Sequence, residues 1–81
     1  MNPSEKKSNG LRTATQVGIA IRARREKLGW SQEQLGFVAN IHRTYVGEIE
    51  RGKKAITVDK LVQVAKALNC SASAILRDCG L

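Results

Sequence analysis

The chain has 81 residues, which suits one domain with a modest core. Its 14 Lys and Arg outnumber 7 Asp and Glu, and the net charge of +7 favours an anionic partner, either a nucleic acid or a membrane surface. No apolar run approaches the roughly 20 residues that span a bilayer, and the first residues, MNPSEKKSNG, lack the apolar segment of a secretory signal, so we expect a cytoplasmic protein without a membrane partner.

The N-terminal segment, residues 1–12, is polar and contains Pro3 and Gly10 without any helical periodicity. We predict a flexible basic arm there, followed by one domain over residues 13–81. Thr13 and Gln16 have the spacing of a capping box, which predicts that the first helix begins at residue 14.

Apolar residues at helical spacing predict this first helix over residues 14–28. They are Val17, Ala20, Ile21 and Leu28, and Gly29 is a good helix stop.

The next two helices are predicted over residues 32–39 and 43–50, with only a short turn between them. Ser31 and Gln34 form a capping box at the first of them, and Trp30 with Leu35 forms a hydrophobic staple. The inward residues are Leu35, Val38 and Ala39. The second helix has a staple of Ile41 and Val46, His42 as a poorer cap, and Gly52 beyond its end.

Two further helices complete the chain, and no strand pattern is present. Thr57 caps a helix that Asn69 ends, with an apolar stripe of Val58, Leu61, Val62, Ala65 and Leu68. Ser71 caps a short last helix with Ala72, Ile75 and Leu76 inward. The predicted fold class is therefore all-α.

The helix over residues 43–50 has two unlike faces. Val46 and Ile49 share an inward side. The opposite side carries hydrogen-bonding groups and a glycine, which would let a partner approach the backbone closely; its residues are Arg43, Thr44, Gly47, Glu48 and Arg51.

The chain from about Val17 to Leu76 resembles the lambda-repressor/Cro-like helix-turn-helix family. The resemblance rests on Gln32 opening a helix, a small residue at Gly36, apolar residues at Ile41, Val46 and Ile49, and the ending Glu50-Arg51-Gly52. Asn40 stands where the family favours Gly, and Asn tolerates the left-handed conformation nearly as well. The resemblance implies a compact five-helix bundle whose helix-turn-helix is formed by helix 2 (residues 32–39) and helix 3 (residues 43–50).

The resemblance also implies roles for individual residues. Helix 3 is expected in the major groove, where base pairs are distinguishable. Arg43, Thr44, Gly47 and Glu48 are expected at base edges. Gln32, Tyr45, Arg51, Lys53 and Lys54 are expected at the DNA backbone, and Arg25 with Glu50 as a structural ion pair between helix 1 and the end of helix 3.

The implied partner is a double-stranded DNA operator bound by a homodimer, because one recognition helix reads too few base pairs. The apolar residues left for an isologous interface are Val64, Ile75, Leu76, Cys79 and Leu81. The alternative is that some of them only close the core of a single chain. The stretch Arg43-Thr44-Tyr45 and the short chain look most like controller proteins of restriction–modification systems. A phage-type or antitoxin-like repressor is the alternative. If the protein activates transcription, Glu33 on helix 2 is the expected contact with RNA polymerase.

Other classes of function find less support in the sequence. Cys70 and Cys79 do not make a disulfide framework, and with His42 as the single histidine we predict no metal site and no cofactor. No catalytic residue is assigned, because no pair of acids or nucleophile with a base converges. The main rival is a protein- or RNA-interaction module on the same fold, in which Phe37 is either a contact with the partner or a partly buried core residue.

Overall fold

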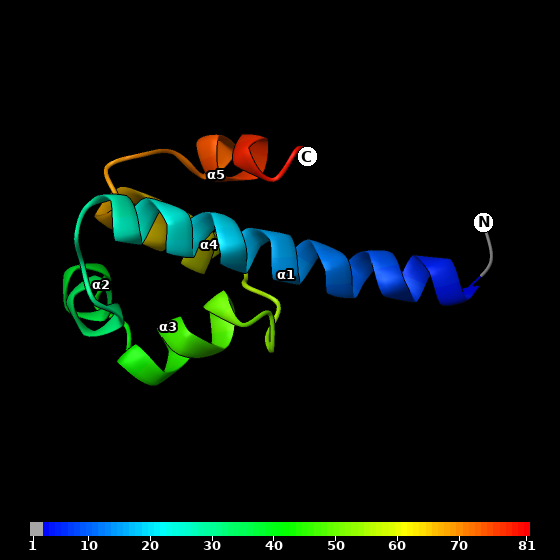
Figure 1. Cartoon of the computed structure of the whole chain (residues 1–81), viewed down its shortest axis with the longest axis horizontal. Helices are drawn as coiled ribbons and strands as arrows, with labels where there is room; N and C mark the ends of the chain where they lie inside the picture. Colours follow the sequence, from blue (N-terminus) through cyan, green and yellow to red (C-terminus); the bar gives the residue numbers. More distant parts are fainter. Residues whose placement is uncertain (1–2) are drawn as a thin grey trace.

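The computed structural model describes the backbone of residues 3–81 and the side chains of residues 13–81. Its helices are α1 (Pro3–Lys27), α2 (Gln32–Ala39), α3 (Arg43–Glu50), α4 (Val58–Ala67) and α5 (Ala72–Asp78), and the described residues contain no strand (Figure 1). The five-helix, all-α prediction is confirmed, and the bounds of α2 and α3 are those that the sequence predicted.

Helix α1 begins earlier than predicted. It starts at Pro3, so Thr13 and Gln16 lie inside it and do not cap its first turn. A proline fits the first turn of a helix, and the polar residues that follow, including Gly10, weaken a helix without blocking it. The predicted flexible arm, residues 1–12, stays a prediction, since its side chains lie outside the described residues.

Local hydrogen bonds fix the start of α2 and the turn between α2 and α3. The Ser31 hydroxyl accepts from the Gln34 N–H at 3.0 Å, and the Gln34 side chain accepts from the Ser31 N–H at 2.7 Å, so the predicted capping box is present. Asn40 adopts the left-handed conformation with φ 59°, as expected. His42 then caps α3, because its Nδ1 accepts from the Thr44 N–H at 3.0 Å.

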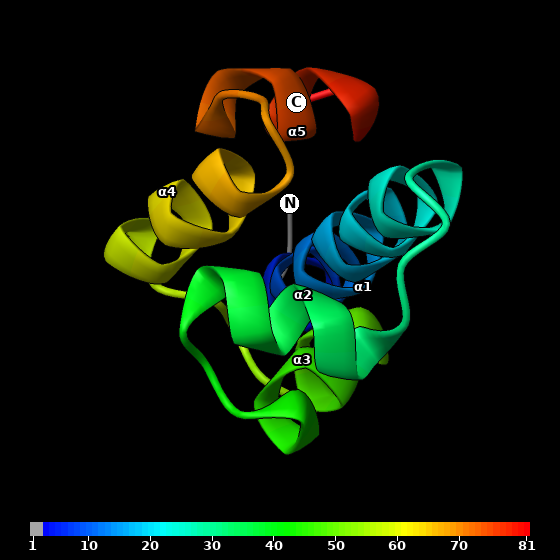
Figure 2. The same cartoon turned by 90° about the vertical axis from the view of Figure 1, so that its left-hand side faces the viewer.

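Helices α1 and α4 separate the α2–α3 pair from α5. Helix α3 packs on α2 and α1, while α5 packs on α1 and α4. In both views α2 and α3 lie on one side and α5 lies on the other (Figures 1 and 2). Helix α1 is therefore a shared support: one part of its surface holds the helix-turn-helix and another holds α5.

The core lies between these helices. Its buried hydrophobic residues are Val17, Ala20, Ile21, Leu35, Ala39, Val46, Ile49, Leu61, Val64, Ala65, Ala67, Leu68 and Ile75. Four residues assigned to apolar stripes are instead exposed: Leu28, Val38, Val58 and Val62. They lie at helix ends or at the edges of the stripes, where the neighbouring helix no longer covers them.

Two glycines allow close packing around the helix-turn-helix. A Cβ on Gly18 would lie 2.3 Å from the Ile49 carbonyl oxygen, so only glycine lets α1 cross the end of α3 at this distance. A Cβ on Gly36 would lie 2.6 Å from the Ile41 carbonyl oxygen. The small residue predicted at position 36 is thus required by the turn backbone.

Candidate nucleic-acid interface

Helix α3 presents the two faces that the sequence predicted. Val46 and Ile49 are buried in the core. Arg43, Thr44 and Arg51 are exposed on the other side. The packing of one face against α1 and α2 therefore fixes which side chains α3 can offer to a groove.

The charged candidates for base contacts each have an ionic partner. Arg43 Nη1 lies 3.3 Å from Glu33 Oε2, and Lys54 Nζ lies 3.5 Å from Glu48 Oε2. Both pairs are at the surface, where such contacts contribute little free energy. A nucleic acid can therefore displace them at small cost.

Gly47 does not offer an open backbone, and this corrects the sequence-based expectation. It is buried, and a Cβ there would lie 3.0 Å from Arg51 Nη1 and 3.4 Å from Gln32 Oε1. A helical side chain reaches back over the turn before it, so Arg51 covers the residue four positions earlier. Gly47 provides the space in which the Arg51 guanidinium lies.

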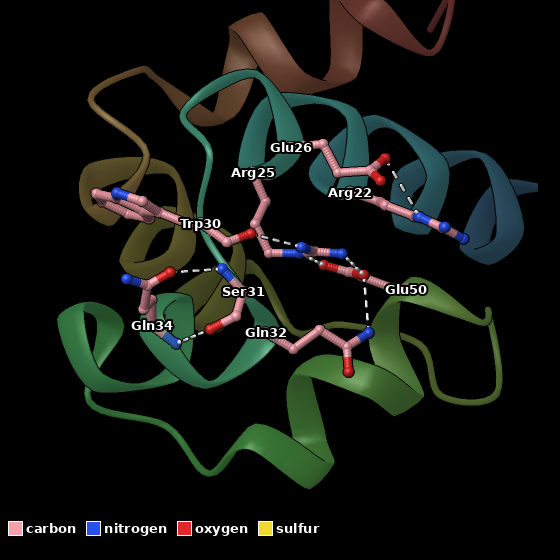
Figure 3. Close-up of polar contacts among 8 residues, drawn as sticks. All are labelled: Arg22, Arg25, Glu26, Trp30, Ser31, Gln32, Gln34 and Glu50. Carbon is pink, nitrogen blue, oxygen red and sulfur yellow. Dashed lines mark hydrogen bonds and ion pairs between the residues drawn. The ribbon is translucent and has the colours of Figure 1, made fainter.

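The ion pair predicted between Arg25 and Glu50 is present and buried. Arg25 donates to the Glu50 carboxylate from Nε at 2.7 Å and from Nη2 at 2.9 Å, and from Nη1 to the Trp30 carbonyl oxygen at 2.7 Å (Figure 3). Both residues are only 8% exposed. Hydrogen bonding to Glu50 raises the pKa of Arg25. The pair ties α1 to the end of α3 and holds the entry to α2.

Gln32, expected at the DNA backbone, also contacts this pair. Its Nε2 donates to Glu50 Oε1 at 3.0 Å, although the residue opens α2 and is only partly buried. One side chain thus joins the buried network to the start of α2.

Cations surround the end of α3. The chain turns at Gly52, with φ 71°, and the Lys53 N–H donates to the Glu48 carbonyl oxygen at 3.0 Å. Within residues 13–81, Arg51 and Lys53 have no acidic partner. Tyr45 lines a hollow with Thr57 and Lys60 at the start of α4. Arg51 and Lys53 thus place two cations without an acidic partner among the described residues at the C-terminal end of α3.

The predicted dimer residues do not all reach the surface. Val64 and Ile75 are 1% and 0% exposed and complete the core of a single chain, so their assignment to an interface is wrong. Leu76 and Cys79 are partly buried, and Leu81 is exposed. The apolar surface around α5 is therefore smaller than predicted.

Sequence reasoning missed a second ion pair that joins α1 to another helix. Arg24 Nε lies 2.6 Å from Asp78 Oδ2, which joins α1 to the end of α5. This hydrogen bond lowers the pKa of Asp78. The two partners are far apart in the sequence, and no local pattern links them. Gly18 was missed as well, although a glycine inside an apolar helical stripe is itself a sign of close packing.

Two other kinds of site find no support among the described residues. No group of three or more His, Cys, Asp or Glu is placed to hold a metal ion in this part of the chain. No helix there is long and apolar enough to cross a membrane. Cys70 and Cys79 are free and partly buried, and burial raises the pKa of the Cys79 thiol.

Comparisons with known proteins agree with this geometry. A family described as helix-turn-helix matches residues 21–75. Control protein C.SmaI of Serratia marcescens is 41% identical over 61 residues, covering 75% of this chain and 73% of that protein. The crystal structure of the clp gene regulator ClgR from C. glutamicum has a TM-score of 0.80 at 26% identity, covering 84% of this chain and 88% of that chain. The crystal structure of the restriction–modification controller protein C.AhdI from Aeromonas hydrophila has a TM-score of 0.75 at 31% identity. The match covers 76% of this chain and 94% of that chain.

The family match covers more than half of the chain and includes α2, α3 and α4 completely, together with the end of α1 and the start of α5. The chain therefore belongs to the lambda-repressor/Cro-like helix-turn-helix family of DNA-binding transcriptional regulators.

Proposed function

We propose that the protein is a controller protein of a restriction–modification system, which binds a palindromic operator as a homodimer with α3 in the major groove. The likeness to C.SmaI carries this proposal, because it extends over three quarters of the chain at 41% identity. The exposed face of α3 supports it, since Arg43 and Thr44 are at its start, where a recognition helix meets base edges. As a DNA-binding protein it would act in the bacterial cytoplasm.

The proposed base contacts are Arg43, Thr44 and Glu48. An arginine can donate two hydrogen bonds to guanine O6 and N7. Gln32, Tyr45, Arg51, Lys53 and Lys54 are proposed at the DNA backbone, where they hold α3 in register. Arg51 and Lys53 are the best placed of these, because no acid within the described residues competes for them.

The proposed dimer uses α5 and the residues after it. Leu76, Cys79 and Leu81 are the larger apolar side chains of that region that are not fully buried. A two-fold pair would space the two copies of α3 roughly one turn of DNA apart, about 34–36 Å. Sedimentation of the free protein tests this pairing.

A contact with RNA polymerase is proposed on α2. Phe37 is 87% exposed and Glu33 lies one turn before it on the same helix. Transcription in vitro with purified polymerase tests the contact: Phe37→Ala would reduce activation while leaving operator binding unchanged. Loss of operator binding in that variant would assign Phe37 to DNA binding instead.

Selection from a random duplex pool tests the main proposal. The protein would enrich a palindrome, and the enriched site would lie beside restriction–modification genes in the source genome. A two-fold site beside unrelated genes would instead favour a phage-type or antitoxin-like repressor. Enrichment of no sequence would contradict both.

A further inference from the structure

The Gln32 amide is held by a hydrogen bond that fixes its orientation. Glu50 Oε1 accepts from both Arg25 Nη2, at 2.9 Å, and Gln32 Nε2, at 3.0 Å. An ionised carboxylate can only accept hydrogen bonds, so the amide nitrogen must face Glu50 and the carbonyl oxygen must face away. Figure 3 shows this arrangement, with the Gln32 oxygen pointing away from Glu50.

The outward side of this amide lies at the proposed DNA surface. Gln32 Oε1 is 3.4 Å from the point that a Cβ on Gly47 would occupy, and Arg51 Nη1 is 3.0 Å from the same point. Gln32 is also the first residue of α2, where backbone N–H groups lack intrahelical acceptors and favour an anion. One N–H of the amide is used by Glu50, and the other remains for a ligand.

Stability alone gives a weak reason for the buried pair beneath Gln32. Apolar residues of similar volume often replace a buried ion pair without loss of stability, because desolvation offsets the attraction between the charges. Here the pair sits under a side chain at the DNA surface, and its carboxylate has one oxygen directed at that side chain. The pair thus fixes the orientation of the Gln32 amide, and an apolar replacement of the pair would leave that amide free to rotate.

We propose that Glu50, held by Arg25, is a positioning residue for DNA binding: it orients Gln32 so that the free amide N–H meets a backbone phosphate at the start of α2. The proposal rests on the proposed binding of DNA through α3 and adds a link from that surface to the buried network. Glu50 does not touch DNA, and its whole effect on affinity passes through Gln32.

The charge of Glu50 and its positioning role predict opposite effects of Glu50→Gln on DNA affinity. Glu50→Gln removes a negative charge near the phosphates, which by itself would strengthen binding. It also leaves one acceptor oxygen where the carboxylate has two, and the charged Arg25 would take that oxygen in preference to the neutral Gln32. Gln32 would then lose its orienting partner, which would weaken binding. A weaker complex therefore separates the positioning role from the charge.

The test is a double-mutant cycle on operator affinity with Gln32→Met, Glu50→Gln and the double variant. We expect Gln32→Met to weaken binding about tenfold and Glu50→Gln about fivefold, as for loss of one hydrogen bond to a charged group. The double variant would bind about as tightly as Gln32→Met alone. The dependence on salt would stay unchanged, because Gln32 is neutral.

Glu26→Gln is the matched control, since it removes the same charge from an exposed pair with Arg22 on α1. It would bind no more weakly than the wild type. All variants are measured at a temperature at which circular dichroism shows them folded. Arg25→Lys, which keeps the charge but loses the two-bond geometry, replaces Glu50→Gln if that variant does not fold, and the same coupling is expected.

Two results would overturn the positioning role. One is an additive cycle, in which the double variant binds about fiftyfold more weakly than the wild type. The other is a Glu50→Gln protein that binds as tightly as Glu26→Gln. Failure of the proposed function is read separately, from wild-type protein that binds operator and scrambled duplex equally.

Discussion

Two neighbouring arginines on α1 form ion pairs of different kinds. Arg25 contacts Glu50 of α3 with both partners buried, whereas the Arg24 and Asp78 side chains, joining α1 to α5, are 31% and 40% exposed. The bond lengths are similar, at 2.7 Å and 2.6 Å. The difference in burial decides what each pair does. The buried pair holds the helix-turn-helix against α1, and the exposed pair makes a surface contact between α1 and α5.

Removing one buried partner should have the largest effect. Arg25→Met leaves Glu50 buried without a counter-ion, which costs about 3–5 kcal/mol. For a domain of this size we expect the Tm to fall by roughly 15 °C or more. Thermal melts check this. A second melt on Arg25→Met with Glu50→Leu should regain most of the loss, and an equally low Tm there would show that packing rather than charge was disturbed.

Deleting a core side chain on the α5 side should come next. Ile75→Ala removes a fully buried side chain and should cost about 2–5 kcal/mol. Leu81→Ala changes an exposed residue and should leave the unfolding free energy within about 0.5 kcal/mol of wild type. Urea titration of both variants compares them. Equal losses would mean that Leu81 belongs to the core of the folded protein.

Adding a methyl group at the crossing of α1 and α3 should cost less. Gly18→Ala places a Cβ against the Ile49 and Glu50 carbonyl oxygens, so α3 must move, at about 1–3 kcal/mol. Gly29→Ala is the control, because nothing lies within 4 Å of the added Cβ. The only strain in that variant would come from an alanine at the positive φ of 75°. Operator affinity should drop in the Gly18 variant alone. Unchanged affinity would show that α3 binds DNA without this fixed crossing.

The exposed pair should give the smallest effect, and it should depend on pH. Hydrogen bonding from Arg24 lowers the pKa of Asp78, whose ordinary value is 3.8. The stabilisation is complete above that ordinary value and is lost as pH falls through the lower folded pKa. Asp78→Asn should therefore be slightly less stable than wild type at pH 7 and equal to it in strong acid. A constant difference across this range would mean that the ionisation of Asp78 is not involved.

The features that the sequence predicts best are those that depend on nearby residues. Ser31 and Thr57 cap helices through hydrogen bonds to residues three positions later, and Asn40 turns the chain by its own backbone preference. The Arg25–Glu50 pair is predictable only through resemblance to a family, since its partners are 25 positions apart.

The sequence-based predictions are wrong mainly where packing against other parts of the chain determines whether a residue is buried. Val64 and Ile75 look like any other apolar residue of an amphipathic helix, and only the packing of α4 and α5 shows that one chain already buries them. The early start of α1 was missed because the polar residues after Pro3 carry no periodic signal. Gly47 was misjudged although Arg51, four positions on, was visible in the sequence as the side chain that covers it.

We propose that α3 reads bases and that its first residue, Arg43, carries much of the specificity. Titration of Arg43→Ala and Lys53→Ala against operator and scrambled duplex at several salt concentrations tests this proposal. Arg43→Ala should cost about 1–3 kcal/mol on the operator, relax the preference at one base pair per half-site and barely change binding to scrambled DNA. Lys53→Ala should weaken both complexes alike and make the salt dependence shallower by about one unit. Equal weakening of both DNAs by Arg43→Ala, with the base preference intact, would contradict the claim and place Arg43 at a phosphate.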